Sequence, residues 1–537
     1  MTDFTSLTEE QLNQMDKHVL ITIIKGLQLQ LNSISSQLEF LTEQIALMNQ
    51  RSFGRKTEKA DQMHQLSLFE IFNEPEFFSD DSEEPEVSEI IVSSHTRKPK
   101  TLREENLKVL PVRVYEHELK KEELDRLFPN GYKEIKPVVY KRLSIIPQTF
   151  LVDEHRIHQY TSKDNDGRII KAKRSPDLFR NSIATASLVA AIINGKFNNH
   201  LPLERQSRCY KDSGVNLETN TMANWMMRAT EIHLNILYEK LLKELITSSL
   251  IHADETPFEV IRDGRSSGAK SYMWVYCTGE SEKHPVILYD YRSTRKADHP
   301  KEFLRSYSGI LVTDGYQVYH SLEKQKDDLK VAGCWVHAKR KYAELVKATG
   351  IPELEGTVAA QGVKLISELF HLNGLYDKSK DKDRKDYRQR EVAPKVDAYF
   401  AWVKESLPKV PAGGSTCKAL QYSLNQEEYL RFFLTDGKVP MDNNTAERAI
   451  RPFTLGRKNW VNVDSIRGAE ASAIIYSLVE TAKANGLRVY EYLEYVLTEL
   501  AAHQDDTSRD FLADLLPWSK ACLLYTSPSP RDRTRSR

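Results

Sequence analysis

Residues 248–261 of the chain read SSLIHADETPFEVI, and the sequence changes character with this stretch. Four more short runs of apolar, β-branched or aromatic residues follow it: SYMWVYCTG at 271–279, PVILYDYRS at 285–293, GILVTDGYQVYH at 309–320 and KVAGCWVH at 330–337. Turn-forming residues lie between the runs, a pattern that is typical of β-strands. The sequence therefore predicts a strand in each of these runs.

Helices are expected between the later strands and after the last one. A helical stretch at 298–307 separates the third run from the fourth, and another helix precedes the fifth. Three strands, a helix, a strand, a helix and a strand suit a mixed sheet of the ribonuclease H type. We expect an α/β multidomain protein with a ribonuclease H-like catalytic core at 249–345 and 433–485. The charged residues between, 346–432, predict a helical insertion.

The first segment, residues 1–60, has the pattern of a coiled-coil helix. Its apolar residues recur at alternating spacings of four and three: Leu20, Ile24, Leu27, Leu31, Ile34, Leu38, Leu41, Ile45 and Met48. A 3.5-residue period places them all on one seam of a helix. The flanking positions are Gln, Asn, Ser and Glu, which favours a multimerisation helix and a homo-oligomer. The alternative is an amphipathic helix that packs on its own protein.

Residues 61–107 are expected to form a linker that is first acidic and then basic. Its part at 70–92 carries nine acidic side chains, no Lys or Arg, and two prolines, which is typical of a disordered segment. The stretch HTRKPKTLR at 95–103 is basic. It is interpreted either as an arm that lies along DNA or as the solvated end of the linker.

Two modules precede the core. Residues 108–180 alternate apolar and polar side chains, which predicts a small β-rich domain. Residues 181–248 are helical and contain a helix, a turn at Gly214, and a second helix expected to be capped near Thr219 or Asn220. This is helix-turn-helix spacing. Many helix pairs share it without touching DNA, so both interpretations stay open.

The C-terminal part is expected to be helical, with helices at 443–452 and 469–498 and a terminal helical segment at 486–520. The sequence then breaks sharply. Residues 521–537, which end in CLLYTSPSPRDRTRSR, have no periodicity and are interpreted as a non-native tail without functional meaning.

Acidic side chains follow two of the predicted strands. Asp254 lies near the end of the first strand, and Asp314 lies at the end of the fourth. Ligands of open α/β sheets gather at strand ends. Clustered carboxylates repel one another, and a divalent cation relieves that cost, so such clusters are often metal sites. A third acid, Glu447, is expected on a short helix capped by Asp442, Asn443 or Asn444.

Each acid also has a structural interpretation. An Asp before Gly is often a turn former, as Asp314 would be. Asp254 would simply end a strand, and Glu447 would pair with Arg451 one turn along its helix.

Taken together, the segments HADETP, TDGY, CWVHAKRKY and DNNTAERAIRPFTLGRKNW resemble transposases of the insertion sequence 66 family of bacterial mobile elements. The separations of 60 residues between Asp254 and Asp314, and of 133 between Asp314 and Glu447, are similar to those of that family. The resemblance extends from the zipper and FGRKTEK at 53–59, through NHLPLERQ at 199–206, to the C-terminal helices. It covers most of the chain.

The resemblance implies a DDE transposase in which Asp254, Asp314 and Glu447 bind two Mg²⁺ or Mn²⁺ ions. His337 falls in the segment CWVHAKRKY that carries the resemblance, where it is expected to position the scissile phosphate or the leaving group, or else to pack near the sheet end. The residues expected to bind DNA are Arg340, Arg448, Arg451, Arg457, Lys458 and Trp460, the last by stacking on a base or, alternatively, buried in the core.

One departure from the family concerns zinc. Many members carry a cysteine zinc-binding domain where this chain has residues 108–180, and no cysteine lies in that segment. Zinc is therefore not expected there. A zinc site that uses His252 or His337 beside Asp254 is the alternative to a magnesium site, because His252 and Asp254 point the same way on a strand.

Composition limits the class of protein. The chain is too long for one core, and no apolar run is long enough for a membrane span. Five scattered cysteines and no signal peptide fit a reducing cytoplasm. The formal net charge is zero, which is unusual for a DNA-binding protein. We expect a transposase that binds element ends and target DNA, with accessory proteins of the same element as further partners. The alternatives are a ribonuclease H-like nuclease without strand transfer and an inactive DNA-binding regulator.

Overall fold

The structure is a computed structural model of the 537-residue chain. It describes residues 16–21, 24–28, 30, 149–161, 169–174, 176–266, 268–349, 356–377, 380 and 383–526. Most of the predicted zipper, the linker, most of the β-rich domain and the end of the tail lie outside these residues. The described part of the zipper is helical, and its apolar side chains at Val19, Ile24 and Leu27 are exposed.

A mixed sheet lies at the centre of the segment that begins at residue 250. Its strands run in the spatial order β5-β4-β3-β6-β7. β3 and β4 are antiparallel, as are β4 and β5, whereas β6 is parallel to both β3 and β7. The strands are β3 (Leu250–Arg262), β4 (Lys270–Thr278), β5 (Ile287–Arg292), β6 (Gly309–Thr313) and β7 (Leu329–Gly333). The predicted order of elements is confirmed, because α10 (Asp298–Phe303) precedes β6 and α11 (Gln317–Glu323) precedes β7.

The first strand is longer than expected. β3 continues past Asp254 to Arg262 because β4 pairs with it as far as Glu259. Its parallel pairing with β6 stops at His252. A short strand that was not expected, β8 (Val463–Ser465), pairs with the far end of β3. Asp254 therefore lies at the edge of the parallel part of the sheet and inside the antiparallel part, not at the end of its strand.

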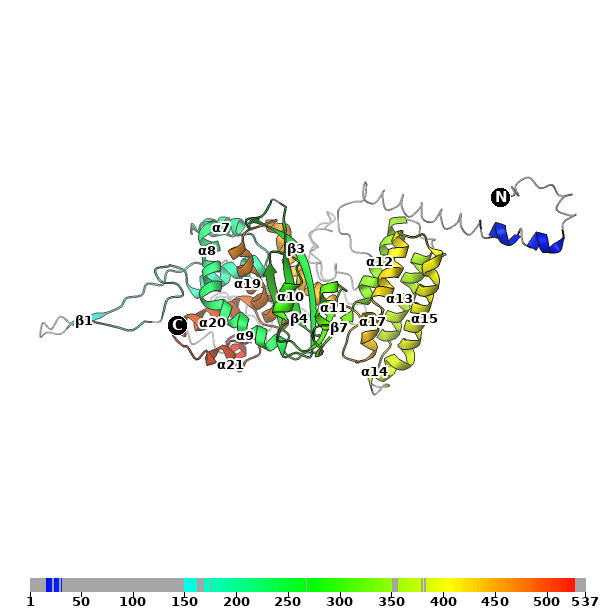
Figure 1. Cartoon of the computed structure of the whole chain (residues 1–537). Coiled ribbons are helices and arrows are strands. Elements are labelled where there is room, and N and C mark those ends of the chain that lie inside the picture. Colours follow the sequence, from blue (N-terminus) through cyan, green and yellow to red (C-terminus); the bar gives the residue numbers. More distant parts are fainter. Residues whose placement is uncertain are drawn as a thin grey trace, which may run out of the picture. The chain divides into compact units, whose positions relative to one another are not determined.

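Helices pack against both sides of this sheet, as Figure 1 shows. One hydrophobic core joins β3, β4 and β5 to a helical group: α6 (Ala186–Ile193), α8 (Thr219–Ala229), α9 (Asn235–Ile246), α18 (Asn444–Trp460), α19 (Ile466–Ala484) and α20 (Val489–Ala502). The other core includes Val312 of β6, Ala332 of β7 and the helices between β7 and α18. Both cores include residues of the sheet. The helices between β7 and α18 therefore pack against the sheet.

The predicted insertion is a group of helices beyond β7 (Figure 1). α12 (Trp335–Thr349) follows β7 directly, and the later elements are α13 (Val358–Gly374), α14 (Arg384–Tyr387), η5 (Arg388–Val392), α15 (Ala393–Ser406), η6 (Leu407–Lys409), α16 (Ser415–Asn425), α17 (Glu427–Arg431) and η7 (Phe432–Leu434). α17 and η7 pack against β7. Tyr342 of α12 and Tyr399 of α15 share hydrogen bonds with the buried Ser423 of α16. The insertion is thus tied to the strand that precedes it.

The helix pair of the helix-turn-helix hypothesis is present, but its cap differs from expectation. α7 (Leu203–Asp212) and α8 are separated by a turn in which Gly214 has a φ of 86°, a conformation that favours glycine. The residue before α8 is Glu218, and it makes no side-chain cap. The hydroxyl of Thr219 donates to Glu204 at 3.4 Å instead, so this threonine ties α8 to α7.

The C-terminal helices are bounded differently from the prediction. α18 runs on through Pro452 to Trp460. The predicted helix at 469–498 is two helices, because the chain leaves α19 at Gly486 with a φ of 74°. The interpreted tail begins inside α21 (Lys520–Thr526), whose Cys522 is buried. In the described part of the chain, no helix combines the length and the apolar character needed to cross a membrane.

Candidate active site

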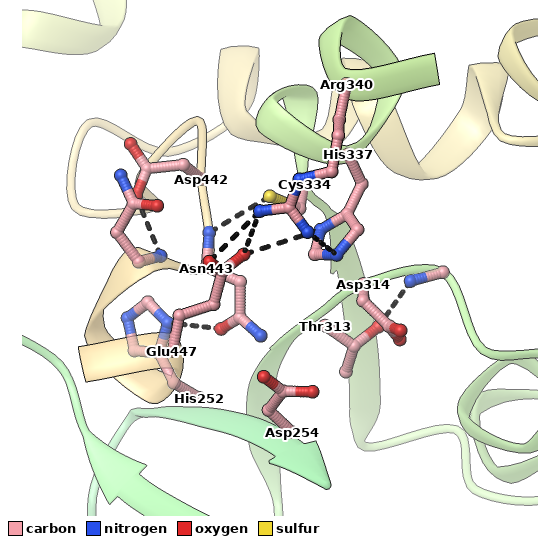
Figure 2. A network of polar contacts seen from close by, with 12 residues as sticks. His252, Asp254, Thr313, Asp314, Cys334, His337, Arg340, Asp442, Asn443 and Glu447 are labelled. Atoms are coloured by element: carbon pink, nitrogen blue, oxygen red, sulfur yellow. Dashed lines mark hydrogen bonds and ion pairs between the residues drawn. The ribbon is translucent and has the colours of Figure 1, made fainter. Parts of the chain in front are cut away.

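Three carboxylates from distant parts of the sequence face a common space (Figure 2). Asp254 comes from β3, Asp314 from the turn after β6, and Glu447 from the first turn of α18. Burial raises the pKa of Asp254 well above its usual value, and the charges of Glu255, Asp314 and Glu447 raise it further. The three predicted acids are therefore close enough to influence one another electrostatically.

The Asp314 turn is held from two directions. Its carboxylate accepts a hydrogen bond from the Tyr316 backbone N–H at 3.0 Å, as expected of a turn-forming aspartate. From the insertion, the Tyr422 hydroxyl donates to the Asp314 carbonyl oxygen at 2.7 Å. Gly315 has a φ of 91°, and a Cβ there would lie 2.9 Å from the Tyr422 hydroxyl. The turn thus requires glycine, and the insertion fixes the turn's backbone.

Glu447 pairs with α12 and not with its own helix. Arg340 Nη2 lies 3.2 Å from one carboxylate oxygen of Glu447 and 3.3 Å from the other, and His337 Nδ1 lies 3.8 Å from one of them. Burial, followed by the charge of Arg340, lowers the pKa of His337. The structure therefore brings His337 and Arg340 to Glu447, while the expected alternative, an ion pair with Arg451, is not the contact that forms.

His252 lies beneath the carboxylates. It is 1% exposed, and its Nδ1 lies 2.8 Å from Oδ1 of Asn443. Burial lowers the pKa of His252 to about 4, so its imidazole is neutral near pH 7. One ring nitrogen is thus already engaged in the core, which weakens the alternative of a zinc site shared by His252 and Asp254.

A second acid network was not predicted from the sequence. The side chain of Glu255 is 3% exposed and pairs with Arg295, whose guanidinium lies 4.0 Å from the centre of the Tyr316 ring. Burial, and then the charge of Asp314, raise the pKa of Glu255 to about 7, although Arg295 opposes the shift. Glu255 follows Asp254 directly in the sequence, but nothing in the sequence indicated its partner 40 residues away.

The residues predicted to bind DNA lie along α18 and α12, but several already have partners. Arg448 pairs with Glu280, and Arg457 donates to the carbonyl of Pro257. Trp460 is half-buried near the Phe197 ring, and Lys196 Nζ lies 5.1 Å from its ring centre. Packing against Lys196 and Phe197 accords with the alternative of a Trp460 buried in the core.

The donor chemistry at the three carboxylates suits a hard divalent cation. Asp254 is a largely buried acid with negative neighbours, and its one hydrogen bond from the described residues comes from the Glu255 N–H. Across the described residues, no three His, Cys, Asp or Glu side chains are gathered closely enough to hold a metal ion as they stand. Glu447 is held by Arg340 instead. A cation bound by Glu447 would therefore have to displace Arg340 from this carboxylate.

Comparison with protein families places this geometry in context. A family described as "Transposase IS66 family" matches residues 181–471, more than half of the chain. The chain belongs to the IS66 family of transposases. Two further matches cover the flanks of this IS66 segment: "IS66 C-terminal element" at 477–518 and "Transposase C of IS166 homeodomain" at 40–114.

Relatives of this IS66-family chain occur in Sinorhizobium fredii (strain NBRC 101917 / NGR234). One, named "Uncharacterized protein y4qI", is 30% identical over 71% of this chain and 70% of its own length. Another, "Uncharacterized protein y4jD", is 28% identical over 70% of this chain and 74% of its own length. Each of these two alignments covers about 70% of this chain.

Proposed function

We propose that the protein is a transposase that cleaves DNA strands at the ends of an insertion sequence and joins them to target DNA. The observation that carries this proposal is the convergence of Asp254, Asp314 and Glu447 on one space in an IS66-family chain. Three carboxylates are hard oxygen donors, which favour Mg²⁺ or Mn²⁺ over zinc. Two such ions would activate the attacking oxygen and stabilise the leaving oxygen of a phosphodiester.

The sheet supports a ribonuclease H-like core. Counted from β3, the strand order is 3-2-1-4-5, with the first three strands antiparallel and the last two parallel to the first. The two aspartates lie on the neighbouring parallel strands β3 and β6, or directly after them. This places them at the edge of the sheet where ligands of open α/β sheets bind.

The residues of this chain have separate tasks in that reaction. Asp254 and Asp314 hold their positions on the sheet, and Glu447 closes the ligand set from α18. If Glu447 held a cation, Arg340 would lose its carboxylate partner and would be available to a DNA phosphate. His337, on the same face of α12, is placed to orient the scissile phosphate or the leaving oxygen. Water would attack first, and the freed 3′-hydroxyl would then attack the target strand.

DNA is the proposed partner in two forms, the element ends and the target. The homeodomain-type match at 40–114, the basic side chains Arg451, Arg457 and Lys458 of α18, and the α7–α8 helix pair support contacts beyond the cleavage site. The heptad pattern at 20–48 supports a homo-oligomer. Both ends of an element must be held in one assembly for joining, and an oligomer would hold them together.

A joining assay tests the proposed function. The protein is incubated with Mg²⁺, a supercoiled target and a duplex that carries a pre-cut element end with a free 3′-hydroxyl. We expect covalent joining of that end to the target. Cleavage of an uncut end without joining would support the ribonuclease H-like nuclease instead. Binding without either product would support the DNA-binding regulator.

A further inference from the structure

Asn443 immediately precedes α18, where an asparagine ordinarily caps the helix with its side chain. Here the side chain makes no such cap. Its Nδ2 donates to the carbonyl oxygen of Ala253 at 2.9 Å, and its Oδ1 lies 2.8 Å from His252 Nδ1. Asn443 is fully buried. The Asn443 amide thus does not cap α18 but hydrogen-bonds β3, 190 residues away in sequence.

The chemistry of these partners fixes the direction of both hydrogen bonds. A backbone carbonyl only accepts, so the Asn443 NH₂ group must face Ala253. Its carbonyl oxygen then faces His252, which must donate from a protonated Nδ1. A neutral imidazole in this tautomer supplies the donor that the amide oxygen requires. Both hydrogen bonds of the Asn443 amide, to His252 and to Ala253, therefore have a fixed direction. We call this arrangement the lock.

The same segment is fastened to the helix that carries His337 and Arg340. The Asn443 N–H donates to Cys334 Sγ at 3.2 Å, and the Trp335 N–H, at the start of α12, donates to the Met441 carbonyl at 2.8 Å. Cys334 and Asn443 are both buried. Residues 441–443 thus join β3, α12 and α18, the three elements that carry Asp254, His337 with Arg340, and Glu447 (Figure 2).

We propose that Asn443, locked by His252, is the positioning residue that sets Glu447 relative to Asp254. Ala253 directly precedes Asp254, and the Asn443 backbone carbonyl accepts the Glu447 N–H at 3.2 Å, so one residue links the backbones of both acids, through its side chain on β3 and through its main chain on α18. Asn443 acts through those backbones and touches no substrate. This inference rests on the proposed function, because it assigns the lock to the cation site of that reaction.

The lock predicts a defect in metal affinity. Asn443→Ala removes both hydrogen bonds, and Asn443→Asp keeps the shape but places an oxygen against the Ala253 carbonyl. Both variants are expected to need about 10-fold more Mg²⁺ or Mn²⁺ for half-maximal cleavage, and to cleave up to about 100-fold more slowly at low metal, because a misplacement near 1 Å costs about that much. Excess metal should recover part of the rate. DNA binding should not change.

His252 provides variants that separate positioning from folding. His252→Asn keeps a donor near the Nδ1 position and should retain most of the metal affinity, whereas His252→Leu removes the donor and should behave like Asn443→Ala. The matched control is Asn444→Ala, which alters the neighbouring asparagine outside the lock and should match the parent protein. Thermal melting identifies the variants that fold.

Mn²⁺ binding, followed by electron paramagnetic resonance without DNA, distinguishes the two levels of the claim. Weaker Mn²⁺ binding in Asn443→Asp and His252→Leu, with parental binding in Asn444→Ala and near-parental binding in His252→Asn, is the expected result. Folded Asn443→Asp and His252→Leu proteins with parental Mn²⁺ affinity would overturn the positioning role. If the parent binds Mn²⁺ but neither cleaves nor joins DNA, the proposed function fails, and the Mn²⁺ affinities still decide the lock. A parent that binds no Mn²⁺ overturns both.

Discussion

Asp254→Asn, Asp314→Asn and Glu447→Gln are each expected to abolish DNA strand cleavage and to leave DNA binding nearly intact. Each change removes a charge that the cations require and keeps the shape of the side chain. Asp254→Asn removes the carboxylate that has the most favourable environment for a cation, because Asp254 is largely buried among other acids. Cleavage of a labelled element end, measured beside an electrophoretic binding assay, separates the two effects.

The control for these variants is Asp327→Asn, which changes an exposed aspartate between α11 and β7. It should cleave as the parent protein does. Substantial cleavage by any one of the three site variants would remove that residue from the metal site. Loss of DNA binding together with cleavage would indicate a folding defect.

Arg388→Met is expected to cause the largest loss of stability among single substitutions in the insertion. Arg388 has no exposed surface, and Nη1 hydrogen-bonds the carbonyls of Phe433, Asp436 and Val439 at 2.7–2.9 Å. Burial lowers its pKa to about 9, so it remains charged near pH 7. Methionine fills similar space but leaves three carbonyls without this donor. Unpaired buried acceptors predict a loss of about 3–5 kcal/mol in the free energy of unfolding.

Urea denaturation monitored by tryptophan fluorescence measures this effect, because Trp335 and Trp402 lie in or against the core of the insertion. The matched control is Arg390→Met in the same η5 element, where the arginine pairs with Glu391 at the surface. An exposed pair of this kind contributes about 1 kcal/mol or less. Equal midpoints for the two variants would show that the Arg388 contacts do not stabilise the insertion.

The strands could be predicted because their sequence runs are short, apolar and separated by turn residues. Pairing could not. β3 extends beyond Asp254 because β4 and β8 lie beside it, and no local pattern reports a neighbour that comes from residue 463 onward. The bounds of α19 were also not predicted correctly from the sequence. This helix is buried on nearly all sides, so it lacks the apolar stripe that marks a surface helix.

The candidate site divides in the same way. Asp254, Asp314 and Glu447 were predicted from motifs and separations, and in the described residues they face one space without being close enough to hold a metal ion as they stand. The groups that hold them were missed because each acts through a distant partner. Asn443 was one of three residues considered as the cap of its own helix, yet its side-chain amide hydrogen-bonds β3. Tyr422 was one of many residues in the predicted helical insertion, yet its hydroxyl donates a hydrogen bond to the Asp314 carbonyl. Contacts between residues over 100 positions apart depend on the packing of the whole fold.

The proposed function requires Asp254, Asp314 and Glu447 to hold hard divalent cations that serve DNA strand cleavage. The most direct measurement strips the protein with EDTA, restores single metals, and follows cleavage of the element's own end. We expect no cleavage in EDTA, recovery with Mg²⁺ or Mn²⁺, and no recovery in Asp254→Asn at any metal concentration. Cleavage that persists in EDTA, or that returns with Zn²⁺ alone, would contradict this requirement.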